Sequence, residues 1–258
     1  MGWIRTAAAS GVLVILLALG RSDSAPTPSP TTAALELLGT HPLSISEPSD
    51  LAIDESGRKL WTVTNNPARV YQLDRGGNVV KTLNYVGQDL EGIAYDATDR
   101  TLWVAEENRR EVIHLDLNGD VLSRHLLDLT GDKNSGLEGI CLDARGRIVL
   151  LNEKRPGLFI ELGSDHAIAT QRRLDFAQDY SGLTYDRRKG CFWIVSDQSR
   201  SLYLWSKDKG VIGTYPLSFP KAEGIALDEA ANLIYIVSDS ENSLYVYRNP
   251  LGSDSGSR

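Results

Sequence analysis

The sequence predicts an all-β fold, a five-bladed β-propeller with four antiparallel strands in each blade. Five similar segments recur along the chain, and the aspartates that end them stand at positions 54, 96, 143, 186 and 228. The intervals are 42, 47, 43 and 42 residues, and each repeat holds four short runs rich in β-branched and aromatic residues. A single sheet of this size cannot cover both of its faces, whereas a closed ring of such sheets can.

The N-terminal 24 residues have the pattern of a secretory signal. One basic residue, Arg5, precedes a continuous apolar run from Val12 to Leu19. This run is shorter than the roughly 20 apolar residues that span a bilayer, and small residues follow it. We therefore predict a signal peptide over residues 1–24 and a periplasmic or secreted protein. The alternative is an uncleaved segment that anchors the protein to a membrane.

The rest of the chain divides into a linker, the propeller and a tail. Residues 25–33 are rich in Pro, Ser and Thr and are expected to be extended. The propeller is predicted over residues 34–249, and residues 250–258 form a polar tail that we expect to be disordered. The last repeat contains only three strand-like runs, and an unassigned run between Leu35 and Ile45 precedes the first repeat. We predict that this N-terminal run closes the last blade as its fourth strand.

The composition excludes some classes of protein. The chain of 258 residues carries 34 acidic and 27 basic residues, for a formal net charge of −7, which disfavours binding to nucleic acid. Two cysteines, Cys141 and Cys191, cannot form a disulfide scaffold. Cys141 stands where other repeats have a small residue and is predicted to pack between blades, with a disulfide to Cys191 as the alternative. We expect a monomer.

Acidic residues gather at one end of the predicted blades. The chain enters along the first, innermost strand and returns along the second, so the start of one and the end of the other lie together. The starts carry Asp50, Glu91, Glu138, Ser181 and Glu223, and the ends carry Asn65, Glu107, Glu153, Asp197 and Asp239. Eight of these ten residues are carboxylates, and we expect them to face one mouth of the central channel.

This convergence has an electrostatic cost, because neighbouring carboxylates raise one another's pKa or require a cation. Oxygen ligands without histidine or cysteine favour Ca²⁺ before Mg²⁺. We predict a Ca²⁺ ion on the channel axis, with ligands drawn from Glu91, Glu138, Glu223 and Asp50. The alternative is a hydrated acidic channel whose glutamates bind backbone amides of the neighbouring blade.

Arginines follow the second strands by two or three residues, at Arg110, Arg155 and Arg200. With these arginines, a rim above the acidic centre would contain Glu107, Glu153, Asp197 and Asp239. Such a rim could bind a small anionic ligand through arginine and a bound metal. The alternative is a set of local ion pairs that hold each turn and contribute little energy.

The sequence contains Glu-Gly-Ile segments at 91–93, 138–140 and 223–225 and motifs such as Trp193-Ile-Val-Ser-Asp. In these segments and motifs the chain resembles the SdiA-regulated (YjiK-like) family of bacterial β-propellers. The resemblance covers about residues 35–249, and this family is similar to NHL-type and calcium-dependent lactonase propellers. It implies that Glu91, Glu138 or Glu223 binds a divalent cation. Ser181 and the pair Asp50-Leu51 depart from the repeated pattern.

We expect a non-catalytic binding or scaffold module that holds Ca²⁺ at the channel mouth and takes a small anionic ligand or a protein partner. The alternative is a metal-dependent hydrolase, lactonase-like or esterase-like, that uses the same mouth. In that case the metal polarises a carbonyl group, and Glu138 or Glu107 is the general base. The sequence contains no G-x-S-x-G, P-loop or H-E-x-x-H motif. Whether the protein is an enzyme stays open at this stage.

Overall fold

The computed structural model describes residues 1–2, 30–130 and 136–252. The predicted signal peptide beyond its first two residues, the first part of the linker and residues 253–258 of the predicted tail lie outside these ranges. Among the described residues, no helix has the length and apolar character needed to cross a membrane.

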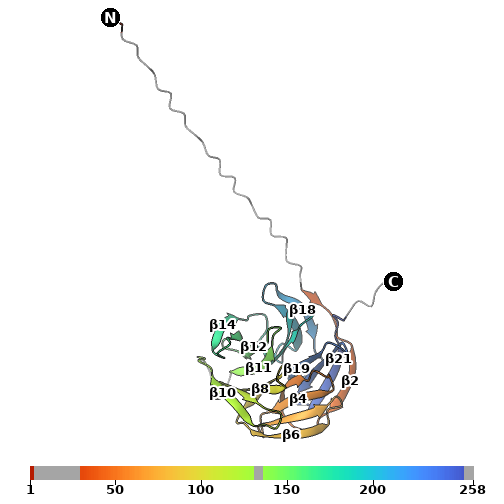
Figure 1. The fold of residues 1–258 in the computed structure, drawn as a ribbon. Helices are drawn as coiled ribbons and strands as arrows, with labels where there is room; N and C mark the ends of the chain where they lie inside the picture. Colours follow the sequence, from red (N-terminus) through yellow and green to blue (C-terminus); the bar gives the residue numbers. More distant parts are fainter. Residues whose placement is uncertain (3–29, 131–135, 253–258) are drawn as a thin grey trace.

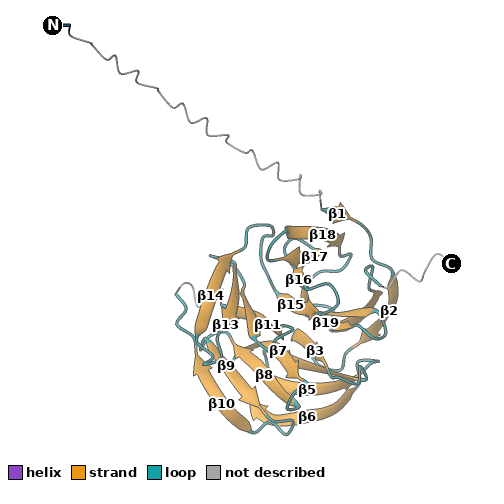
Figure 2. Cartoon of the chain, turned by 45° about the horizontal axis from the view of Figure 1, so that its top comes forward, coloured by secondary structure: helices purple, strands orange, loops and turns teal. Residues whose placement is uncertain are grey.

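Five antiparallel sheets surround a common centre, as Figure 1 shows. The predicted five-bladed propeller with four strands per blade is therefore confirmed. Each blade is a four-stranded meander whose first strand is innermost, and Figure 2 shows β3, β7, β11, β15 and β19 around the centre. The starts of these inner strands lie at one end of the channel, and their ends lie at the other.

The strand bounds follow the predicted repeats. Blade 1 consists of β3 (Pro48–Ile53), β4 (Lys59–Thr64), β5 (Arg69–Asp74) and β6 (Val79–Val86). Blade 2 consists of β7 (Leu90–Asp96), β8 (Thr101–Glu106), β9 (Glu111–Leu115) and β10 (Val121–Leu126). Blade 3 consists of β11 (Leu137–Leu142), β12 (Ile148–Asn152), β13 (Leu158–Leu162) and β14 (Ile168–Arg173). Blade 4 consists of β15 (Gly182–Asp186), β16 (Cys191–Ser196), β17 (Ser201–Ser206) and β18 (Gly210–Pro216).

Blade 5 combines the two ends of the described chain. It consists of β19 (Ala222–Asp228), β20 (Leu233–Ser238), β21 (Ser243–Arg248) and the N-terminal β2 (Leu37–Pro42). β2 pairs antiparallel with β21, so the N-terminal run closes the ring as the sequence predicts. A two-residue strand that the sequence does not predict, β1 (Thr31–Thr32), pairs parallel with β18 at the outer edge of blade 4.

The core lies between neighbouring blades. Val63 of β4 and Val104 of β8, for example, belong to one buried apolar cluster that joins blades 1 and 2. The aromatic position of the second strands is occupied by core residues, at most 5% exposed: Trp61, Trp103, Val149, Trp193 and Tyr235. Cys141 and Cys191 are both buried and free, so they pack as apolar side chains and form no disulfide.

A ring of glycines explains why Glu-Gly-Ile recurs. A Cβ atom built at Gly182 would lie 2.3 Å from the carbonyl oxygen of Glu223, and one at Gly92 would lie 2.3 Å from that of Glu138. At Gly224 it would lie 2.3 Å from the Cα of Asp50. The inner strands thus approach one another through their backbones near the axis, where larger side chains would clash.

Candidate functional site

The acidic side chains reach the channel mouth through irregular pairing at the start of the inner strands. The register against the second strand shifts between Leu90 and Gly92 in β7, and between Leu137 and Ile140 in β11. Such irregularities redirect a side chain out of the regular alternation of a strand. The glutamates at these shifts line a cavity of about 350 Å³, together with their counterpart in β19: Glu91, Glu138 and Glu223.

These three glutamates share one electrostatic environment. Loss of hydration raises the pKa of Glu138 well above its usual range, and the charges of Glu91 and Glu223 raise it further. Loss of hydration likewise raises the pKa of Glu223 to about 7, although the ammonium of Lys221 opposes the increase. The mouth therefore holds carboxyl groups that bind protons near neutral pH unless a cation replaces them.

Three carboxyl groups come together on the blade 2 side of the mouth, where Glu91 lines the cavity and Asp89 and Glu107 lie beside Glu91. One oxygen each from Asp89, Glu91 and Glu107 lies within 4.8 Å of the others. Burial raises the pKa of Glu107 to about 7 although the backbone N–H of Gly136 donates to its Oε1 at 2.7 Å, and a hydrogen bond with Asp89 raises it further. Carboxyl oxygens this close together repel one another when ionised, and a metal ion bound between them would relieve that repulsion.

Asp89, Glu91 and Glu107 offer only carboxylate oxygens as ligands to a metal ion. The Asn65 side chain, one of the residues at the ends of the second strands, donates from Nδ2 to Oε1 of Glu91 at 2.7 Å and fixes that carboxylate. The Ser49 hydroxyl also bonds to Glu91. Oxygen ligands that are held in place by outer hydrogen bonds suit a hard cation such as Ca²⁺.

The blade 5 side of the mouth carries its own cation. Nζ of Lys221 lies 3.2 Å from Oε1 of Glu223 and 3.5 Å from Oδ2 of Asp197. Although partial burial opposes it, these carboxylates raise the pKa of Lys221 above its usual value. Among the described residues that line the mouth, Lys221 is the one positive side chain. The mouth is therefore asymmetric among the described residues: Lys221 compensates carboxylates at blade 5, whereas no described lysine or arginine forms an ion pair with Asp89, Glu91 or Glu107 at blade 2.

Asp50 lies one residue deeper than the glutamates. Asp50 pairs with Val63 of β4 and occupies the position that Gly92 occupies in blade 2. Its carboxylate accepts hydrogen bonds from the backbone N–H of Ile93 at 2.9 Å and of Ile140 at 3.4 Å. Burial raises the pKa of Asp50 well above its usual range despite these hydrogen bonds. It does not line the mouth, and within the described structure its Oδ1 has no hydrogen-bond partner. Its predicted role as a metal ligand stays a prediction.

The predicted rim residues occupy two kinds of position. Glu153 and Asp239 line the mouth, and Glu153 forms an ion pair with its neighbour Lys154. Asp197 contacts Lys221 at the edge of the same cavity. These acidic residues of the predicted rim are thus at or beside the mouth, and lysines partly neutralise Glu153 and Asp197.

The three predicted arginines stand in the turns between second and third strands. Arg110, Arg155 and Arg200 have φ values of +54°, +55° and +46°, the left-handed conformation that such turns require. The backbone N–H of Arg110 donates to the carbonyl oxygen of Glu107 at 3.0 Å, and that of Arg200 donates to Asp197 at 2.9 Å. The described residues that line the mouth include none of these arginines. Their binding of an anion stays a prediction.

Two residues of the site, Asp89 and Lys221, are not among those that the repeated motifs predict. Each stands two positions before the repeated glutamate of its blade, Glu91 or Glu223. The same position in the five repeats reads Glu, Asp, Gly, Asp and Lys, from residue 47 to residue 221. Because this position varies between the repeats, it belongs to no shared motif, and its variation between acidic and basic residues is the signal in the sequence that marks it.

The fold and the site define a five-bladed propeller with an asymmetric acidic mouth. Residues 39–248 match the family described as SdiA-regulated, and the chain belongs to that family. The family resemblance of the repeated motifs is thereby confirmed.

Solved structures share the fold at low sequence identity. A glutaminyl cyclase from Myxococcus xanthus has a TM-score of 0.69 and 15% identity, covering 85% of this chain and 97% of its own. A gluconolactonase from Xanthomonas campestris has a TM-score of 0.55 and 15% identity, covering 82% of this chain and 98% of its own. A chain of a nidogen/laminin complex has a TM-score of 0.57 and 18% identity, covering 78% of this chain and 75% of its own. This fold therefore occurs both in enzymes and in a protein–protein complex, and identifies neither function for this chain.

Proposed function

We propose that this protein is an extracytoplasmic binding module that holds Ca²⁺ at the acidic mouth, between Asp89, Glu91 and Glu107. The bound ion then offers free coordination positions to an anionic group of a small ligand or a protein partner. The observation that supports the proposal most strongly is the close approach of three carboxyl oxygens, within 4.8 Å of one another. Without a cation, such a cluster must take up protons or repel itself.

The asymmetry of the mouth locates the proposed ion. At blade 5 the ammonium of Lys221 already compensates Glu223 and Asp197, and it would repel a second cation. At blade 2 the carboxylates have hydrogen bonds from neutral donors, Asn65 and the backbone of Gly136. A divalent cation therefore gains most at blade 2, with Glu138 close enough to raise the affinity through its charge.

An enzymatic alternative has its own support. The mouth is a cavity of about 350 Å³ beside the proposed ion, which leaves room for a substrate. Glu107 has its pKa raised to about 7, the range in which a carboxylate serves as general base or acid. Fold neighbours include a gluconolactonase and a glutaminyl cyclase. In this alternative the protein is a metal-dependent hydrolase of a lactone or ester, with Glu138 or Glu107 as its base.

Calorimetric titration of the metal-free protein with CaCl₂ at pH 8 tests the proposed cation site. We expect saturable 1:1 binding, a higher melting temperature with Ca²⁺ and a lower one after EDTA. Glu91→Gln should weaken binding by at least about tenfold, because it removes a charged ligand. Glu36→Gln is a matched control, since Glu36 is exposed and pairs with Arg248 outside the mouth. No saturable binding, or equal binding by Glu91→Gln, would reject the proposal.

A substrate screen separates the module from the enzyme. Lactones, esters and phosphoesters are incubated with the Ca²⁺-loaded protein and with its Glu138→Gln variant. Turnover that requires both Ca²⁺ and Glu138 would establish the hydrolase alternative. Ca²⁺ binding without turnover of any of these classes supports the binding module.

A further inference from the structure

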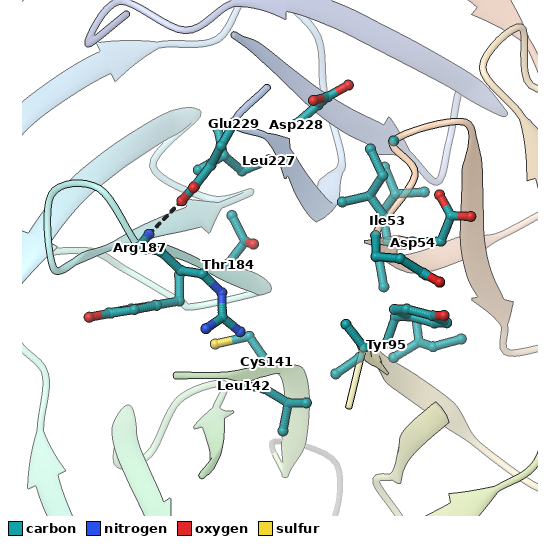
Figure 3. A pocket seen from close by; sticks show the side chains of 18 of the residues that line it. Ile53, Asp54, Tyr95, Cys141, Leu142, Thr184, Arg187, Leu227, Asp228 and Glu229 are labelled. Atoms are coloured by element: carbon teal, nitrogen blue, oxygen red, sulfur yellow. Dashed lines mark hydrogen bonds between the residues drawn. The ribbon is translucent and has the colours of Figure 1, made fainter. Parts of the chain in front are cut away.

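A second cavity lies at the opposite end of the propeller, with a volume of about 580 Å³. It is surrounded by the ends of the inner strands and the turns that follow them (Figure 3). Residues 49, 91, 138 and 223 line the mouth, whereas residues 51, 93, 140 and 227 line this cavity. The buried Asp50 lies between the two groups. The cavity is therefore distinct from the acidic mouth, and its size is in the range of small-molecule sites.

The wall of the cavity is apolar and aromatic over a large part. Ile53, Tyr95 and Leu142 stand around it in Figure 3, and Tyr185 and Leu227 complete the wall. Tyr95 is held in place by hydrogen bonds of its hydroxyl group with Glu55 and Arg100. An apolar ligand would remove this surface from water and gain free energy in proportion to the area covered.

One positive side chain reaches into this apolar wall. The five residues that follow the terminal aspartates of the repeats are Glu55, Ala97, Ala144, Arg187 and Glu229, so Arg187 is the single cation in that column. Its guanidinium extends over the cavity beside Cys141 (Figure 3). In the described part of the chain, no carboxylate forms an ion pair with it, and only its backbone N–H donates to Oε1 of Glu229, at 2.5 Å.

The carboxylates around the cavity have other partners. Asp228 forms an ion pair with Arg75 at 3.0 Å, and Glu55 forms one with Arg100 at 3.4 Å. Asp54 accepts hydrogen bonds from the backbone of its own turn, among them that of Arg58 at 3.1 Å. Glu229, the fourth carboxylate of the lining, accepts the backbone N–H of Arg187. The guanidinium of Arg187 therefore remains available to bind an anionic ligand.

We propose that this cavity binds a small amphipathic carboxylate, with its apolar part against Tyr95, Tyr185 and Leu142 and its carboxylate on the Arg187 guanidinium. A guanidinium binds a carboxylate through two parallel hydrogen bonds, which fixes the orientation of the ligand as well as its charge. Binding at this end is independent of any cation in the mouth, because Asp50 and the glycine ring close the channel between the two.

Calorimetric titration with sodium octanoate in the presence of EDTA tests this inference. Octanoate should bind 1:1, whereas octan-1-ol and octyltrimethylammonium, which have the same chain without the negative charge, should bind at least about tenfold more weakly. Arg187→Gln should weaken octanoate binding by at least about tenfold. Arg188→Gln removes the neighbouring positive charge, which does not line the cavity, and should leave the binding unchanged.

Two further variants test whether octanoate binds in this cavity rather than in the mouth. Ala97→Trp should block octanoate binding by filling the cavity from an exposed lining position, while the melting temperature stays near that of the unchanged protein. Glu138→Gln should leave octanoate binding unchanged, because it lies in the mouth. Absence of saturable octanoate binding, equal binding of the three probes, or equal binding by Arg187→Gln would each overturn the proposal.

Discussion

Asp50 occupies the one place near the axis where the inner strands leave room for a side chain. Gly92, Gly139, Gly182 and Gly224 fill the equivalent positions of the other blades, and a Cβ atom at any of them would lie 2.7 Å or less from backbone of the next strand. The Asp50 carboxylate bonds instead to backbone N–H groups of neighbouring inner strands. One aspartate thus satisfies donors that the ring would otherwise bury without partners.

Replacement of Asp50 should therefore reduce the free energy of unfolding, because its carboxylate accepts hydrogen bonds from buried backbone N–H groups. Asp50→Ala leaves the N–H groups of Ile93 and Ile140 buried without an acceptor, and we expect the free energy of unfolding to fall by about 2–4 kcal/mol. Asp50→Asn keeps one acceptor oxygen and should cost less. Asp208→Ala, at an exposed turn, is the control. Urea denaturation measures the free energy of unfolding of the three variants. An Asp50→Ala variant as stable as the unchanged protein would contradict the role of Asp50 as a buried acceptor.

At the scale of the strands, closure by β2 is the feature on which the ring depends. β2 is the one strand of blade 5 that comes from the N-terminal end of the described chain, and its pairing with β21 joins residues 37 and 247. β1 adds only a two-residue parallel pairing to β18. Loss of β2 would expose the edge of β21 and part of the apolar cluster beneath it.

Two truncated chains distinguish these contributions. A chain that begins at residue 33 lacks β1 and should melt within a few degrees of the longer protein. A chain that begins at residue 47 also lacks β2 and should lose cooperative unfolding or melt at least about 10 °C lower, because the ring is open. Circular dichroism melting curves provide the measurement. A cooperative transition at an unchanged temperature for the shorter chain would contradict closure by β2.

The elements could be predicted because each blade repeats the same pattern. The strands, the closing run at the N-terminus and the convergence of Glu91, Glu138 and Glu223 all followed from what the repeats share. The position of Asp50 did not, because Asp50 stands four residues before Asp54, as Gly92 stands before Asp96, whereas Glu91 stands five residues before Asp96. Asp89 and Lys221 were missed because the position that they share differs from blade to blade.

At the scale of the whole molecule, the propeller has two unlike ends. One end gathers carboxyl groups around a cavity with Lys221 at one side, and the other gathers apolar side chains around Arg187. The backbone ring with Asp50 lies between them. A cation bound in the mouth would relieve the repulsion among its carboxylates.

This distribution predicts how stability depends on pH without metal. The pKa of Glu107 and that of Glu223 are raised from 4.5 to about 7, so the folded protein binds more protons than the unfolded chain between these values. Their contribution to stability is present below pH 4.5 and is lost as the pH rises through 7, with a change of the order of a few kcal/mol. Urea denaturation in EDTA at several pH values between 5 and 8 measures it.

Two changes should reduce this loss of stability. Ca²⁺ should restore stability most at pH 8, where its carboxylate ligands are ionised. Glu138→Gln should raise the stability of the metal-free protein at pH 8, because it removes one repelling charge from Glu91 and Glu223. A metal-free protein whose stability rises from pH 5 to pH 8 would contradict the electrostatic account of the mouth.

The central claim is that a divalent cation binds at the blade 2 side of the mouth. A crystal structure of the protein grown with CaCl₂, with anomalous differences that identify the ion, tests it most directly. The account predicts one Ca²⁺ at about 2.3–2.6 Å from oxygens of Asp89, Glu91 and Glu107. A mouth without an anomalous peak, or an ion bound only elsewhere on the protein, would contradict it.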